Sequence, residues 1–384
     1  MKLAEPDILE DYLNGKYHIA FVELLKDRTT GKNIFWGTKS YAEEYGEGYD
    51  EYDEITIERI TGERGRVIQP RAVKDKATQN KRAKDMAEVF TPSWICNAQN
   101  NLVDNAWFEA HGYGKPRIGG WFNDDQKEWI VNPTAVFVPN DDNWKKYVLD
   151  IRLEITCGEA PYIVSRYDAV NPDQDATMPI DRRVGLLDRK FRILHENIEA
   201  GDKRAWLTWA KRAVQSVYGY EWQGDNLLIA RESIFFTYLD YYELKFGNRN
   251  TDWKTLKSIG RIISWNFWQM DGLKMVVPNS CGVKEICINM KDIDSARFNN
   301  ESGLTLFQIE IPDPIYEPRA CEGCRTGDIN MHNGMYCLIR DWQVTGQEDK
   351  KKPRQGDLKK ERKEELASGA IVKFYSFVGN IQIK

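Results

Sequence analysis

A stretch of cysteine, histidine and glycine residues near the C-terminal end could bind a metal ion. CEGCRTGDINMHNGMYC (321–337) has the spacing Cys-x2-Cys-x7-His-x4-Cys. A thiolate pair from one tight turn and a later pair of ligands suit tetrahedral Zn²⁺, which would then be structural rather than hydrolytic. If His332 is only a surface residue, Cys281 or Cys287 could complete a four-thiolate site instead. The predicted ligands are Cys321, Cys324, His332 and Cys337.

Four other pieces of sequence combine turn residues with carboxylates at expected strand ends. In chain order they are EVFTPSW (88–94), LEITCGEAPY (153–162), VYGYEWQGDNLLIAR (217–231) and WNFWQMDGL (265–273). A tight turn at the carboxyl end of a parallel strand lets backbone amides approach a ligand. A carboxylate that ends the next strand can accept hydrogen bonds from both hydroxyls of a ribose. The four pieces together therefore indicate a nucleoside-binding edge of a sheet.

This ordered set resembles the amino-group DNA methyltransferases, and more narrowly the methylase subunits of restriction–modification systems, described as restriction endonuclease subunit M. The resemblance covers about residues 86–275 by motif. It implies a Rossmann-like sheet that binds S-adenosylmethionine and methylation of the exocyclic amine of adenine in DNA. It also implies DNA as a partner, and a second restriction–modification subunit could supply target recognition.

The resemblance assigns each piece to a part of the cofactor. The Phe-Thr-Pro segment at 90–92 matches the family's segment that closes over the methionine end, and the loop from Glu154 matches its Asp-Pro-x-Cys-Gly-x-Gly-x-Phe loop. Ala160 replaces the second glycine of that loop. Glu221 would bind the ribose, and Asp271 would bind the adenine amine. The implied cofactor-binding residues are Phe90, Thr91, Pro92, Glu154, Cys157, Gly158, Ala160, Glu221 and Asp271.

The catalytic motif of that family is not intact. The family carries Asn/Asp/Ser-Pro-Pro-aromatic, whose polar side chain and prolyl carbonyl accept hydrogen bonds from the target amine. The chain contains no Pro-Pro pair. Its nearest stretch, IPDPIYEP (311–318), gives Asp313, Pro314 and Tyr316 as catalytic candidates, with an ordinary proline-rich connection as the alternative. VVPNS (276–280) and SFVGN (376–380) are poorer matches, so the chain could be half of a split enzyme, a truncated copy or a degenerate relative.

Composition places the chain among packed globular proteins. It has 384 residues, of which 41% are hydrophobic, and a net charge of −5 that gives no global attraction to nucleic acid. No apolar run is long enough to span a membrane, and the acidic N-terminal sequence lacks signal-peptide order. We therefore expect a cytoplasmic protein whose seven cysteines are reduced. The basic stretches at 71–85 and 350–363 could contact phosphates or form solvated surface.

The predicted fold class is α/β, with strands that alternate with helices. We expect strands at 147–155, 216–222 and 261–268, and helices at 93–108, 206–217 and 226–246. Before them we expect a strand or short helix at 18–25, a strand at 34–38 and a hairpin over 54–70. The predicted units are a β-containing N-terminal unit with a basic linker (1–85), a Rossmann-like methyltransferase domain (86–285) and a zinc-knuckle-like segment with a lysine-rich region (286–384).

Two other functions explain part of the pattern. A non-enzymatic, zinc-stabilised module could retain a methyltransferase fold and bind DNA or a protein. An NAD-dependent oxidoreductase would account for the sheet and for Glu221, but it would leave the Phe-Thr-Pro segment and Asp271 unused.

Overall fold

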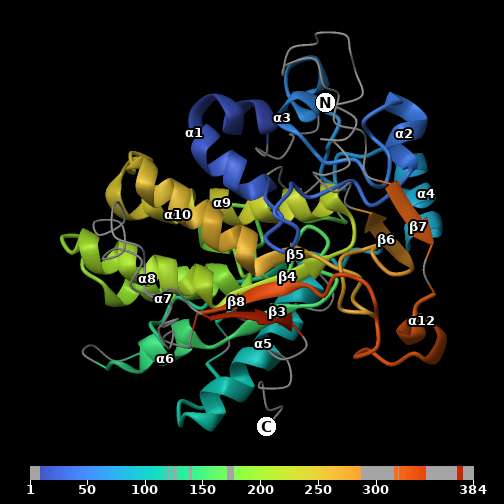
Figure 1. Ribbon diagram of the computed structural model, residues 1–384. Helices are drawn as coiled ribbons and strands as arrows, with labels where there is room; N and C mark the ends of the chain where they lie inside the picture. Colours follow the sequence, from blue (N-terminus) through green and yellow to red (C-terminus); the bar gives the residue numbers. More distant parts are fainter. Residues whose placement is uncertain are drawn as a thin grey trace, which may run out of the picture.

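A parallel sheet of three strands lies at the centre of the molecule (Figure 1). The computed structural model describes residues 9–116, 118–119, 122–123, 128–137, 141–170, 177–286, 315–318, 320–342 and 370–374. The strands are β3 (Arg152–Glu154), β4 (Val217–Glu221) and β5 (Phe267–Gln269), in the order β3-β4-β5. Glu154 pairs with Gly219, and Glu221 pairs with Gln269. The carboxyl ends of all three strands therefore lie at one edge of the sheet.

Helical segments connect these strands and cover the sheet. α7 (Leu186–Asn197) and α8 (Lys203–Gln215) join β3 to β4, and α9 (Gly224–Phe246) and α10 (Trp253–Asn266) join β4 to β5. In the view of Figure 1, α9 and α10 cross above the strands, and α5 (Ser93–Ala110) lies below them. α8 and α10 start at aspartates whose side chains accept a backbone N–H of the first turn. The helices predicted at 93–108, 206–217 and 226–246 and the strand at 216–222 are confirmed.

Two predicted strands begin within helices. Residues 147–155 form the end of α6 (Asn143–Leu149) and only then the short strand β3. Residues 261–266 continue α10, and β5 begins at Phe267. The β-branched pair Ile262 and Ile263 suggested a strand, but both side chains are buried in the helix, so tertiary packing decides the local conformation.

The N-terminal region consists mainly of helices, and the helical alternative predicted for 18–25 is confirmed. α1 (Glu10–Leu25) includes residues 18–25, and α2 (Ser40–Tyr45), α3 (Ile57–Ile60), the 3₁₀ turn Gly62–Arg64 and α4 (Lys76–Met86) follow. The predicted strand at 34–38 and the hairpin over 54–70 are wrong. Phe35 and Glu54 form only an isolated bridge. α1 packs along α10, where Gly260 allows the backbone of Ala20 to approach closely.

Short antiparallel pairs surround the central sheet. β1 (Phe122–Asn123) pairs with β2 (Glu128–Trp129), β6 (Val283–Ile286) with β7 (Ile315–Pro318), and β8 (Leu338–Asp341) with β9 (Ala370–Lys373). After β9, the Phe374 ring packs against Tyr220 and Trp268 of the central sheet. α12 (Glu322–Thr326) lies between β7 and β8.

Most buried apolar side chains form one continuous core, which extends from Leu13 of α1 to Phe374 after β9. The N-terminal residues pack into the same core as the sheet. Among the described residues, no helix combines the length and the apolar character that a membrane crossing requires.

Candidate metal centre and strand-tip site

Three cysteines and one histidine converge beside the β6–β7 pair. Cys281 precedes β6, Cys321 is the N-cap of α12, Cys324 lies within α12, and His332 lies in the loop before β8. Their ligand atoms all lie within 4.8 Å of one another. The cluster brings together two parts of the chain that are separated by about forty residues, so a bound ion would join them.

The distances within this cluster fit a tetrahedral ion. His332 Nδ1 lies 3.5 Å from Sγ of Cys281, 3.6 Å from Sγ of Cys321 and 3.7 Å from Sγ of Cys324. Zinc–sulfur bonds of about 2.3 Å and zinc–nitrogen bonds of about 2.0 Å place tetrahedral N and S ligands about 3.5 Å apart. The residues present therefore fit a Cys₃His zinc site.

Local sequence explains why these ligands can approach one another. A Cβ at Gly323 would lie 2.6 Å from the His332 backbone nitrogen, and a Cβ at Gly334 would lie 2.8 Å from Cys281 Sγ. Burial opposes ionisation of Cys321, but hydrogen bonds from the backbone amides of Asn333 and Cys324 and from His332 lower its pKa to about 6. Burial raises the pKa of Cys281 to about 12. A metal ion would displace the proton that Cys281 retains and bind the thiolate.

The fourth ligand differs from the one predicted. Cys337 is fully buried, and its Sγ–H donates to the backbone oxygen of Gln269 at 3.4 Å. Cys281 takes the position expected for Cys337 and joins the predicted Cys321, Cys324 and His332. Sequence spacing alone considered Cys281 only for a four-thiolate site, because its approach depends on the path of the chain after β5.

The second candidate site lies at the carboxyl ends of the central strands, where the loop after β3 meets Glu221. We call it the strand-tip site; it comprises the loop 154–160, Glu221 and Asp271. The Gly158 backbone N–H donates to Glu221 Oε2 at 2.9 Å, and the Gln223 backbone N–H donates to its Oε1 at 3.2 Å. The Cys157 backbone N–H donates to the Tyr220 oxygen at 2.8 Å. The structure thus brings Cys157, Gly158 and Glu221 together.

The loop itself has an unusual backbone. Thr156, Gly158 and Ala160 adopt positive φ values of 44°, 53° and 60°. Glycine adopts this conformation readily, whereas alanine and especially threonine are strained in it. Ala160 thus keeps the left-handed backbone that a glycine would favour, although its methyl group is fully buried.

The Phe-Thr-Pro segment covers this loop. A Cβ at Gly158 would lie 3.0 Å from Phe90 Cε1, so the ring sits directly on the glycine. The Arg71 guanidinium lies 5.2 Å from the centroid of the same ring. Thr91 and Pro92 follow, and Pro92 is the N-cap of α5. Phe90 therefore contacts the loop, and a role of 90–92 in cofactor binding stays a prediction.

Two carboxylates of the strand-tip site are buried. Burial raises the pKa of Glu154 to about 8, although the backbone amides of Tyr162 and Ile163 donate to it and oppose the shift. Burial also raises the pKa of Glu221, against the amides of Gly158, Gln223 and Trp222. The negative charge of Glu221 adds to the increase at Glu154.

Asp271 lies two residues beyond the end of β5 and is nearly buried. Its Oδ1 accepts the backbone amides of Leu273 at 3.0 Å and Lys274 at 3.2 Å, and its Oδ2 lies 3.1 Å from Lys274 Nζ. Asp271 therefore stabilises the turn formed by residues 271–274. The predicted adenine contact would add to this structural role.

The predicted catalytic candidates lie mainly outside the described part of the chain. Asp313 and Pro314 are beyond it, as are 350–363 and 376–380. The backbone of Tyr316 lies in β7, opposite Glu285. Asn279 of the VVPNS stretch has a positive φ of 60°.

The basic stretch at 71–85 is not a uniformly solvated surface. Lys76, Lys81 and Lys84 are exposed, but Lys74 and Arg82 are buried and pair with carboxylates. Charge density alone could not separate the two groups, because burial depends on which side chains reach the carboxylates of other segments.

Comparison of the chain with protein-family models, with curated proteins and with solved structures finds no match.

Proposed function

We propose that the chain is a DNA-methyltransferase-like subunit of a restriction–modification system. It would bind S-adenosylmethionine at the strand-tip site and methylate the exocyclic amine of adenine in DNA. The observation that carries this proposal is the arrangement at adjacent tips of a parallel sheet. A left-handed loop, a carboxylate that ends the next strand and the ring of Phe90 meet around Gly158.

The residues of the strand-tip site have suitable chemistry for this ligand. Glu221 accepts the Gly158 amide on Oε2 and the Gln223 amide on Oε1, and a carboxylate has about four acceptor positions, so it could also accept the ribose hydroxyls. Phe90 would contact the methionine end, and the Arg71 guanidinium already lies 5.2 Å from the centroid of its ring. Asp271, at the tip of β5, would accept the adenine amine. Bound S-adenosylmethionine would supply the methyl group on its sulfonium.

Asp313, Pro314 and Tyr316 remain the proposed groups that position the target amine. The polar side chain and a carbonyl of this stretch would accept the amine hydrogens, and the aromatic ring would stack on a base extruded from the duplex. Because the second proline of the motif is missing, a partner subunit could supply an intact motif.

Isothermal titration of the full chain with S-adenosylmethionine tests cofactor binding. We expect wild-type protein to bind, and Glu221→Ala to weaken binding by about tenfold or more, since two ribose hydroxyls lose their acceptor. Glu199→Ala, an exposed carboxylate after α7, is the control and should bind like wild type. Absence of binding by wild-type protein would refute the proposal. Transfer of labelled methyl to mixed DNA, with and without Asp313→Ala, then tests the chemistry.

We also propose that the Cys₃His cluster binds Zn²⁺ in a structural role. All four ligands of a tetrahedral ion come from the protein, so none remains for a reactive water. This cluster favours a second candidate function, a non-enzymatic zinc-stabilised module that binds DNA or a protein. Stoichiometric zinc together with no heat on addition of S-adenosylmethionine would support the second function.

A further inference from the structure

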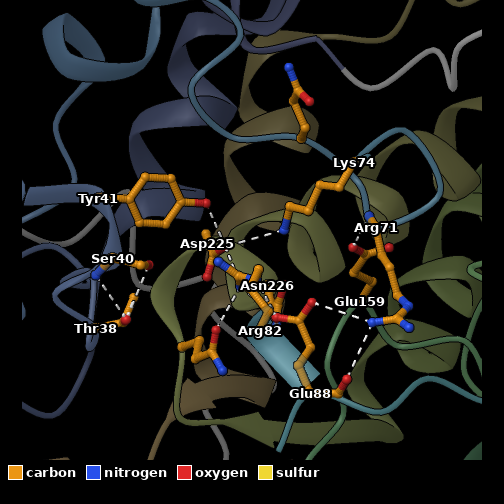
Figure 2. A network of polar contacts seen from close by, with 12 residues as sticks. Thr38, Ser40, Tyr41, Arg71, Lys74, Arg82, Glu88, Glu159, Asp225 and Asn226 are labelled. Carbon is orange, nitrogen blue, oxygen red and sulfur yellow. Dashed lines mark hydrogen bonds and ion pairs between the residues drawn. The ribbon is translucent and has the colours of Figure 1, made fainter. Parts of the chain in front are cut away.

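A buried cluster of charged side chains adjoins the strand-tip site. It consists of three basic and three acidic residues from 71–88, the loop after β3 and the start of α9, so its formal charges balance. Figure 2 shows these side chains directed toward one another from separate segments. We call this set the charge cluster. Its members are Arg71, Lys74, Arg82, Glu88, Glu159 and Asp225.

Arg82 is the central member of the charge cluster. Its Nε donates to Glu88 Oε2 at 2.6 Å, and its Nη2 donates to Gln223 Oε1 at 2.6 Å and to Asp225 Oδ2 at 2.7 Å. The side chains of Arg82, Glu88 and Asp225 are 5%, 2% and 0% exposed, so solvent screens these contacts very little. A planar guanidinium can bridge several acceptors at once, which a lysine ammonium in its place could not reproduce.

The contacts of Arg82 join the Phe-Thr-Pro segment to the strand-tip site. Glu88 lies two residues before Phe90, and Asn226 Nδ2 of α9 also donates to it, at 3.1 Å. Gln223, the other acceptor, lies two residues after Glu221 and donates its own backbone N–H to that carboxylate. Arg82 therefore fixes the approach to Phe90 relative to the residue proposed to bind ribose.

The loop after β3 is held to the same cluster. Glu159 Oε1 accepts the Arg71 backbone N–H at 2.6 Å, and its Oε2 accepts the Tyr167 hydroxyl at 2.6 Å. Arg71 in turn donates to the Glu88 backbone oxygen at 3.2 Å and lies over the Phe90 ring. Both surfaces around Gly158, the loop below and the ring above, are thus positioned by one set of buried contacts.

We propose that Arg82 is a positioning residue that holds Phe90 over the strand-tip loop and so sets affinity for the methionine end of S-adenosylmethionine. This inference rests on the proposed function and adds a residue that contacts no part of the ligand. It gives the segment before residue 86 a role in cofactor binding. A ligand that ends at the ribose, such as adenosine, would not require Phe90 to be in place.

Calorimetric titration with S-adenosylmethionine and with adenosine tests this inference. For Arg82→Lys we expect the Kd for S-adenosylmethionine to rise about tenfold and the Kd for adenosine to change less than about twofold. Lys81→Met, at the exposed neighbouring position of α4, is the control and should leave both constants unchanged. General damage to the fold would weaken both ligands together, so an equal loss for both ligands would overturn the inference.

A second variant guards against a misfolded protein. Asn226→Ala removes one neutral donor to Glu88 without exposing an unpaired charge, and it should shift the ratio of the two constants in the same direction by a smaller factor.

Hydrogen exchange of the amides at 88–91 gives a readout without cofactor: faster exchange in Arg82→Lys than in Lys81→Met is expected, and equal exchange overturns the inference. Wild-type protein that binds adenosine but not S-adenosylmethionine would refute the proposed function and the inference together. Faster exchange with unchanged affinities would refute the inference alone.

Discussion

The metal centre and the strand-tip site differ in whether the polar groups of the site already have strong hydrogen-bond partners within the protein. In the strand-tip site, Glu221 and Asp271 already accept backbone amides, and each carboxylate has a structural role without any ligand. In the metal centre, three thiols surround one imidazole nitrogen at 3.5, 3.6 and 3.7 Å. Thiol hydrogen bonds are weak, so they account poorly for such convergence, whereas an ion accounts for it well.

This contrast shows which kind of geometry points to a ligand. Carboxylates at strand ends often stabilise turns, whether or not a ligand binds there. Their position alone is therefore weak evidence for a binding site. A Cys₃His set with tetrahedral distances has few structural alternatives. The metal centre is therefore the more specific of the two signals, although the strand-tip site involves more of the chain.

The largest expected effect is the loss of the metal. Structural zinc contributes about 10–16 kcal/mol to the folding of small zinc domains, and the segments around Cys281 and Cys321 should lose order without it. We expect Cys281→Ser to lower the zinc content of the purified protein and its Tm. Cys337→Ala, which changes the ligand predicted from spacing, should retain zinc. Mass spectrometry of metal content decides the matter: loss of zinc in Cys337→Ala but not in Cys281→Ser would contradict the assignment.

The sequence predicted local features better than long-range ones. Pro92 and Ser93 marked the start of α5, and the alternation of α8, β4 and α9 was readable from periodicity. Cys321, Cys324 and His332 lie close in sequence, so their spacing revealed them. Cys281 joins them only because the chain returns after β5. Bridges from Val276 to Asp271 and to Tyr336 place it there, and no local pattern encodes them.

The misread elements have a related cause. The strand expected at 34–38 has the right composition, but it lies along the tips of the sheet instead of entering it. Gln269 exchanges hydrogen bonds with the Phe35 backbone, and Gly224 donates its N–H to the Trp36 oxygen. Lys74 and Arg82 are buried because both pair with Asp225 at the start of α9.

A pH series should give the second-largest effect, and it concerns the strand-tip site. The unfolded chain ionises Glu154 near its usual pKa of 4.5, whereas the folded protein retains the proton up to about 8. Glu154 therefore contributes stability below pH 4.5 that is lost as the pH rises toward 8, a change of the order of 5 kcal/mol. Urea unfolding measured at several pH values between these limits should show that the free energy of unfolding declines less in Glu154→Gln than in wild type. Some decline should remain, because burial also raises the pKa of Glu10 to about 8. Parallel curves for the two proteins would show that Glu154 ionises normally.

The smallest expected effect concerns backbone strain in the turns of the two sites. Near the metal centre, a glycine at 327 adopts the left-handed conformation that ends α12, whereas the strand-tip loop places Thr156 and Ala160 in it. Thr156 is exposed, so Thr156→Gly should relieve backbone strain and raise the free energy of unfolding by about 1 kcal/mol. Ala160→Gly relieves similar strain but loses a buried methyl group worth about 0.8 kcal/mol, so its net effect should be near zero. Urea denaturation measures both variants. If Thr156→Gly destabilises the protein, the left-handed backbone at the strand tip is not a source of strain. The turns of the two sites would then not differ in backbone strain.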